Sequence, residues 1–172
     1  MKAQGIAAKN GWHRFTALQY FYSIASRDIE REIVPLAIDQ QLAILPWSPL
    51  AGGFLSGKYR RAVNVAGDSR RDVFDFPHID KEKAYSIIEV MEPIAQKLRV
   101  SVAQVALAWV RQQPAITSTI IGAKKPEQLQ QNIDSVKLVL DSDDLARLQE
   151  VSALQAQYPG WMVERQGGDR KQ

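Results

Sequence analysis

The sequence predicts an α/β protein with parallel strands, each followed by helix. Short apolar or β-branched runs at 12–19, 42–47 and 117–121 alternate with longer amphipathic stretches, and this alternation is typical of βα units in a parallel sheet. Polar and glycine-rich residues follow the runs, as at the carboxyl ends of strands where α/β proteins bind ligands. The length of 172 residues suits one domain.

The composition is that of a soluble globular protein, with 45% apolar and 24% charged residues. The absence of cysteine excludes disulfides, thiolate metal sites and thiol nucleophiles. No apolar run approaches the ~20 residues that a membrane helix needs, and residues 1–5 lack a hydrophobic signal core. We therefore expect a cytoplasmic protein that does not enter the membrane.

The positive charges are scattered in pairs and do not form one basic face. The formal net charge is +3, and the basic pairs are Arg60-Arg61, Arg70-Arg71 and Lys124-Lys125. Nucleic-acid binding would need a basic face with interleaved aromatic residues, so no nucleic-acid partner is expected. The pairs suit a small polyanion such as a nucleotide, or they are solvated surface charge.

Local signals give the boundaries of the elements. Ser101 and Gln104 form a capping-box pattern, Pro126 suits the first position of a helix, and Pro35 is expected to kink or weaken its helix. In chain order, the expected elements are a helical segment over 1–10, a strand over 12–19, a helix from Ser26 to about Gln40, a strand over 42–47, a helix from Asp80 to about Leu98, a helix from Ser101 to about Gln112, a strand over 117–121, a helix over 126–134, a short extended segment over 136–140, and a helix from Ser142 to about Ala153.

The stretch from Leu42 to Tyr59 is the central candidate for a site. Its apolar strand ends in Trp47 and Ser48 and continues through Gly52-Gly53 to Lys58. Small residues let the backbone approach a ligand, backbone N–H groups and a lysine can face phosphate, and Trp47 offers a flat apolar face. The same Pro and Gly residues are also what an ordinary turn requires.

Three segments resemble the aldo-keto reductases, on the branch with bacterial aldo-keto reductases and potassium-channel beta subunits. They are WSPLAGGFLSGKY at 47–59, IIGAKKPEQLQQN at 120–132, and FTALQYFYSIASRDIEREIVPLA at 15–37. The resemblance covers roughly residues 1–155. It implies the C-terminal part of a TIM (β/α)8 barrel, with about three parallel strands (the sixth to eighth) and flanking helices in residues 1–158, and a loose tail at 159–172.

The resemblance also implies NADPH as cofactor, bound in an extended form without a Rossmann fold. Gln19 would hydrogen-bond the nicotinamide carboxamide, and Trp47 would stack on the nicotinamide ring. The pyrophosphate would be lined by Ser48, Pro49, Leu50, Ala51, Gly52 and Lys58, and Arg70 would fold over the cofactor. The 2′-phosphate end would be held by Gly122, Lys124 and Gln128, and the adenine by Gln131 and Asn132. Gln131 stands where an acidic residue is common in the family.

No catalytic residue is expected in this chain. The Asp, Tyr, Lys and His of the family lie on earlier strands, and neither His13 nor His78 has a matching context. The tyrosines at 20, 22 and 59 have proton-donating hydroxyls, but packing aromatics are the simpler interpretation. The acids Asp143 and Asp144 suit the first turn of a helix.

Three functions remain open. The first is the NADPH-binding part of a reductase that transfers hydride to an aldehyde or ketone, with the catalytic residues in a complementary N-terminal half. The second is a non-catalytic cofactor-binding or interaction module, and the third is a degenerate fragment.

Because three parallel strands leave unpaired edges, we expect self-association or a partner half, with exposed edges or apolar surface at Phe15–Leu18, Leu42–Leu45 and Thr119–Ile121. The resemblance implies that loops, including the one at 60–79 and the C-terminal tail, form most of the carbonyl-substrate pocket. Phe74, Phe76 and Trp161 are candidates to line this pocket, or they anchor the loop and the tail to the barrel.

Overall fold

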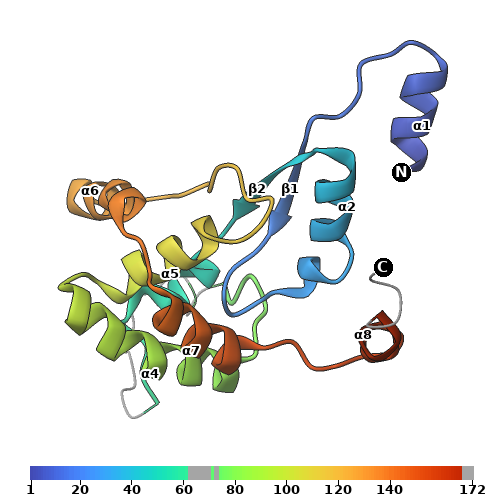
Figure 1. The fold of residues 1–172 in the computed structure, drawn as a ribbon. Coiled ribbons are helices and arrows are strands. Elements are labelled where there is room, and N and C mark those ends of the chain that lie inside the picture. Colours follow the sequence, from blue (N-terminus) through green and yellow to red (C-terminus); the bar gives the residue numbers. More distant parts are fainter. Residues whose placement is uncertain (62–70, 72–73, 168–172) are drawn as a thin grey trace.

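A parallel two-stranded sheet lies at the centre of the molecule, in a computed structural model that describes residues 1–61, 71 and 74–167 (Figure 1). Strand β1 (Ala17–Phe21) pairs with β2 (Ala43–Trp47) so that Ala17 lies opposite Ala43 and Phe21 opposite Trp47. Helix α2 (Ile33–Gln40) connects the two strands. The result is a βαβ unit, which confirms the α/β class and is consistent with part of an α/β barrel.

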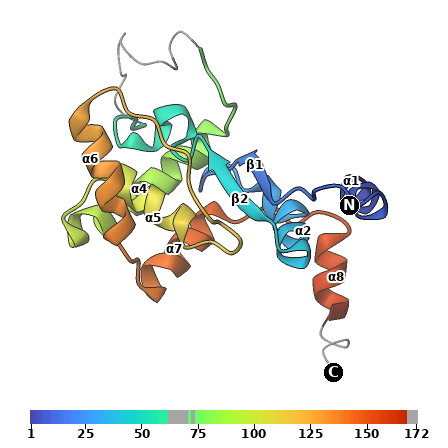
Figure 2. The ribbon, with the colours of Figure 1, turned by 90° about the horizontal axis from the view of Figure 1, so that it is seen from above.

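The remaining elements are helical. Figures 1 and 2 show α4, α5, α6 and α7 on one side of the strands, with α1, α2 and α8 on the other. Their bounds are α1 Lys2–Lys9, η1 Asp28–Glu30, η2 Ala51–Ser56, α4 Lys81–Leu98, α5 Val102–Arg111, α6 Pro126–Asp134, η3 Ser135–Lys137, α7 Ser142–Ser152 and α8 Gly160–Gly167, where η marks a 3₁₀ helix.

The helices with strong capping signals lie where the sequence predicts them. The Asp80 side chain accepts a hydrogen bond from the N–H of Lys83 at the start of α4, and Ser101 and Gln104 form both bonds of the capping box at the start of α5. Pro126 is the first residue of α6. Local side-chain chemistry therefore determines these boundaries.

The single helix expected from Ser26 to Gln40 is wrong. The chain forms the short helix η1 and then begins again at Ile33 as α2. Pro35 is consequently the third residue of α2, where its missing N–H would have no partner within the helix anyway. A continuous helix would have placed the proline in its interior, at a cost of about 3 kcal/mol.

The third strand predicted at Thr117–Ile121 is also wrong. One parallel bridge forms, in which the Ile44 N–H donates to the Ala115 carbonyl (3.1 Å) and the Thr117 N–H to the Ile44 carbonyl (3.0 Å). The next position on β2 is Pro46, which has no N–H to donate. The Pro46 carbonyl instead accepts from Ile120 (2.8 Å), so the segment runs beside β2 without forming a regular strand.

Strand β1 begins five residues later than predicted. Since β2 starts at Ala43 opposite Ala17, residues 12–15 have no strand to pair with. The side chain of Gln4 replaces a strand there, because its amide donates to the Phe15 carbonyl (2.8 Å) and accepts from the Phe15 N–H (3.0 Å). Two smaller differences are the 3₁₀ turn η3 in the segment expected to be extended, and helix α8 within the tail.

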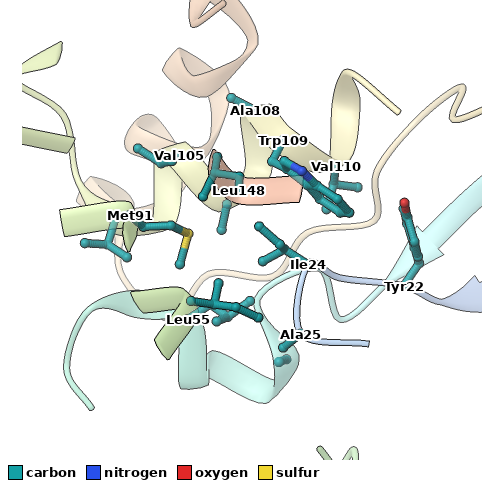
Figure 3. Packing of buried hydrophobic residues seen from close by; sticks show 14 of the residues in the cluster. Tyr22, Ile24, Ala25, Leu55, Met91, Val105, Ala108, Trp109, Val110 and Leu148 are labelled. Carbon is teal, nitrogen blue, oxygen red and sulfur yellow. The ribbon is translucent and has the colours of Figure 1, made fainter. Parts of the chain in front are cut away.

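The hydrophobic core lies between α4, α5, α7 and the two loops that follow the strands. Figure 3 shows side chains from these elements converging, among them Ile24, Leu55, Met91 and Leu148. Leu55 belongs to η2 and is fully buried. The loop after β2 is therefore joined directly to the core.

A buried ion pair connects the end of β1 to α7. The Arg27 guanidinium donates two bonds to the Glu30 carboxylate (2.8 Å each) and one to the Ser152 hydroxyl (2.7 Å), and it lies 5.1 Å from the centre of the Trp109 ring. The Tyr22 hydroxyl donates to Glu30 (2.6 Å). Burial, together with this carboxylate, raises the pKa of Tyr22 above its ordinary value, and its ring is part of the hydrophobic core.

Two of the three predicted exposed segments do expose apolar side chains. Phe15 is 63% exposed, and Ile120 and Ile121 are 40% and 38% exposed. The prediction is wrong for Leu42–Leu45, because Leu42 and Ile44 are buried and β2 has backbone partners on both sides. Within the part of the chain that the structure describes, no helix is both long and apolar enough to cross a membrane.

The start of α7 supplies a stability test. The predicted start at Ser142 is confirmed, and the cap before it is Asp141, whose carboxylate accepts from the Asp144 N–H (2.8 Å) and from Lys97 (2.7 Å). We expect Asp141→Ala to lower the free energy of unfolding by about 1 kcal/mol and Ser142→Ala to change it by less than half of that, as measured by urea denaturation. A larger loss for Ser142→Ala would contradict this capping arrangement.

Candidate functional site

Three segments that are distant in the sequence meet near the carboxyl end of β2. The end of β1 lies beside it, because Phe21 is the register partner of Trp47. On the other side, the bond from the Ile120 N–H to the Pro46 carbonyl places the start of the 120–132 motif one residue from Trp47. The two motifs singled out in the sequence are therefore neighbours in space.

Trp47 is in contact with two phenylalanine rings. Its ring centre is 5.0 Å from that of Phe21, with the planes tilted by 32°, and 5.7 Å from that of Phe76, with the planes nearly parallel at 13°. Gln19 precedes Phe21 by two residues and therefore shares its face of the strand. Gln19 is exposed, so its amide and the Trp47 ring lie on one accessible face.

A tight turn follows Trp47. Ser48 has a positive φ of 52°, its hydroxyl accepts from the Gly52 N–H (2.8 Å), and its carbonyl accepts from the Ala51 N–H (2.8 Å). The Gly53 N–H donates to the Leu50 carbonyl (2.9 Å). These three N–H groups are therefore used inside the turn and are not available to an anion in this conformation.

The side chains of the turn differ in their access to a ligand. Pro49 and Ala51 are buried, whereas Ser48 and Leu50 are half-buried. Lys58 is exposed, and its ammonium makes no ion pair with any other residue described. Of the groups proposed for the pyrophosphate, Lys58 is the cation, and it is accessible.

The arginine that packs against this turn is Arg71, to which the family resemblance assigned no role. Its guanidinium is buried, donates to the carbonyls of Ala51 (2.5 Å) and Pro77 (3.0 Å), pairs with Asp75 (2.5 Å), and lies over the Phe54 ring. Arg70, the residue predicted from the resemblance, lies outside the described residues. The sequence signalled an arginine at this place only through the Arg70-Arg71 pair, and a pair does not show which of its two members is buried.

The second motif forms an exposed turn at the start of α6. The Gln128 side-chain oxygen accepts from the Lys124 N–H (3.0 Å), which brings these two predicted residues together. Gly122, Lys124 and Gln131 are exposed, whereas Asn132 is buried. The exposed members have the access that a ligand needs, whereas the Asn132 side chain has little.

The two histidines, His13 and His78, are exposed. Tyr59, one of the tyrosines with a proton-donating hydroxyl, stacks on Phe54 with ring centres 4.7 Å apart and planes at 4°. Across the described ranges, no three His, Asp or Glu side chains gather as a potential metal site. The arrangement offers flat aromatic surface, an amide and exposed lysines, which suit binding of a planar, anionic molecule.

These features define an α/β protein with a candidate ligand site at the carboxyl ends of parallel strands. Residues 2–153 match the aldo/keto reductase family, and the chain belongs to that family.

Curated relatives include a reductase, an uncharacterized oxidoreductase and a probable channel subunit. The chain is 29% identical over 158 residues to versiconal hemiacetal acetate reductase of Aspergillus parasiticus, covering 91% of this chain and 46% of that protein. It is 34% identical to an uncharacterized oxidoreductase of Bacillus subtilis (88% and 44% covered). A probable voltage-gated potassium channel subunit beta of Arabidopsis thaliana is 31% identical (67% and 36% covered). The chain thus spans less than half the length of these relatives.

The contact between the turn and Phe76 can be tested at two adjacent glycines. A Cβ atom on Gly52 would lie 2.6 Å from the Phe76 carbonyl oxygen and 3.0 Å from the Arg71 guanidinium, whereas one on Gly53 would meet nothing within 4 Å. Both residues have positive φ. We expect Gly53→Ala to lower the free energy of unfolding by about 1–2 kcal/mol through backbone strain, and Gly52→Ala by about 2–4 kcal/mol through strain and overlap.

Urea denaturation of the two variants measures this difference. Equal losses in both variants would show that the Phe76 carbonyl does not lie against Gly52 in solution.

Proposed function

We propose that this chain carries the NADPH-binding part of an aldo/keto reductase, in which hydride passes between NADPH and the carbonyl carbon of an aldehyde or ketone. The observation that supports the proposal most is the hydrogen bond between Ile120 and Pro46, since it brings the two motifs of the family resemblance side by side. A dinucleotide has an aromatic ring at one end and phosphates along its length. It therefore needs a stacking surface and cations at separate places along one edge.

The residues divide between the two ends of the cofactor. Trp47 supplies the stacking face for the nicotinamide, and the Gln19 amide has the donor and acceptor that match the carboxamide. Ser48, Leu50, Gly52 and Lys58 follow the pyrophosphate, with Pro49 and Ala51 contributing backbone atoms only. Gly122, Lys124 and Gln128 receive the 2′-phosphate end, and Gln131, with the buried Asn132, borders the adenine.

The bound cofactor would supply the hydride, and the chain would orient and shield it. Proton transfer to the carbonyl oxygen needs a general acid, and in our proposal this chain does not supply it. We therefore assign the acid to a complementary N-terminal half, or to a partner, that supplies the Asp, Tyr, Lys and His of the family. The exposed apolar side chains of Phe15, Ile120 and Ile121 are the surface that such a partner, or a second copy of the chain, would cover.

The second candidate is a non-catalytic cofactor-binding module. The relative that is a probable voltage-gated potassium channel subunit beta favours it. A degenerate chain that binds no ligand is the remaining possibility. Both the reductase part and the module would act in the cytoplasm in our proposal, on a small-molecule cofactor and without nucleic acid.

Cofactor choice gives the first functional test. We expect NADPH to quench tryptophan fluorescence by stacking on Trp47, and Lys124→Gln to weaken NADPH about three- to tenfold because it removes a cation from the 2′-phosphate. NADH lacks that phosphate, so its affinity should not change in the variant. Lys125→Gln is the matched control and should have the smaller effect. Equal weakening of NADPH and NADH by Lys124→Gln would contradict the assignment.

Turnover separates the two candidates. We expect the 172-residue chain to bind NADPH without oxidising it when an aromatic aldehyde is added, as followed by absorbance at the nicotinamide band. Recovery of turnover on adding the N-terminal half of a relative would support the reductase part, and binding without recovery would support the module. Turnover by the chain alone would show that an acid is present and would contradict the assignment of the acid to a partner.

A further inference from the structure

We propose that Phe76 is an internal competitor for the face of Trp47 on which the nicotinamide stacks, so that cofactor binding requires Phe76 to leave. This inference rests on the proposed function. The Trp47 ring is in contact with two phenylalanine rings, Phe21 and Phe76, and only Phe76 stacks on it nearly parallel. A ligand ring that stacks on Trp47 where Phe76 now lies would have to displace Phe76.

Phe76 is the ring that can be displaced. Phe21 is part of β1, and its position opposite Trp47 is determined by the register of the parallel pair. Phe76 lies in the 74–79 segment, which contains no strand or helix, and its side chain is 40% exposed. Moving Phe21 would disrupt the sheet, whereas moving Phe76 would disrupt only contacts of this segment.

The geometry of Phe76 is that of a stacked ligand. Its plane is within 13° of the Trp47 plane, whereas Phe21 is tilted by 32°. Near-parallel, offset rings are the arrangement that a nicotinamide would adopt on an indole. Phe76 thus already makes the type of contact that we assign to the cofactor.

Specific bonds hold Phe76 in this position. Arg71 donates to the Pro77 carbonyl and to Asp75, on either side of Phe76, and also to the Ala51 carbonyl in the turn after Trp47. Asp75 also pairs with Lys81 (2.8 Å). The guanidinium therefore joins the 74–79 segment to the turn that would border the pyrophosphate, and displacement of Phe76 would have to break or rearrange these bonds.

The test is the affinity for NADPH of Phe76→Ala. Removing the competing ring should tighten binding by roughly two- to tenfold, the range expected for one aromatic pair. Phe74→Ala is the matched control, since Phe74 contacts Phe76 (5.4 Å between ring centres) and is itself exposed; its effect should be smaller. Affinity is measured by isothermal titration calorimetry, which does not depend on tryptophan signals.

A second measurement needs no cofactor. The protein is labelled with 5-fluorotryptophan, and the ¹⁹F resonance of Trp47 is assigned as the one that disappears in Trp47→Phe. Phe76→Ala should shift this resonance in the free protein, while the resonances of the other three tryptophans stay in place. No shift would show that Phe76 does not cover Trp47, and this result would overturn the inference.

The outcomes distinguish this inference from the proposed function. If the wild-type chain binds NADPH and Phe76→Ala binds it equally well or more weakly, the inference that Phe76 competes for Trp47 would be overturned, and the proposed function would stand. NADPH binding by Phe76→Ala but not by the wild-type chain would support both this inference and the proposed function. No NADPH binding by either protein would overturn the proposed function, and the inference that rests on it would fall as well.

Discussion

The parallel pairing of β1 with β2 is the constraint on which the rest of the structure depends. Its register places Phe21 opposite Trp47 and so determines one face of the aromatic surface at the strand ends. Because the strands are parallel, both carboxyl ends lie at one edge, and the loops that follow them lead from that edge into the core through Tyr22, Ile24 and Leu55. The loops that form the candidate site at the surface are thus the same loops that pack into the core.

Two buried arginines fix the loops in that position. Arg27 lies over Trp109 and bonds to Glu30 and Ser152, while Arg71 lies over Phe54 and bonds to two backbone carbonyls and Asp75. Each guanidinium thereby exchanges water for several hydrogen bonds and an aromatic face, which limits the cost of burying its charge. A planar group with five donors suits such a junction, and a lysine would satisfy fewer of these partners.

The sequence predicted most of the helices but only part of the sheet, for a physical reason. The starts of α4, α5 and α6 depend on side chains within four residues of each boundary, and such signals can be read directly. The third strand was predicted from the β-branched residues at Thr117–Ile121. It does not form because Pro46, on the neighbouring strand, has no N–H to donate. Burial of Arg71 rather than of its neighbour, and the stacking of Phe76 on Trp47, likewise arise from tertiary contacts that no local pattern contains. The motif residues around Trp47 and Lys124 could be singled out because they carry a family resemblance.

The amide of Gln4 has a consequence for association between chains. An unpaired strand edge offers alternating donors and acceptors to any other extended chain, and Phe15 stands just before β1 at such an edge. By accepting from its N–H and donating to its carbonyl, one glutamine side chain occupies the position that a foreign strand would use first. Gln4, on helix α1, therefore blocks the addition of another strand at Phe15. Intermolecular β-sheet growth along β1 would have to begin beyond residue 15.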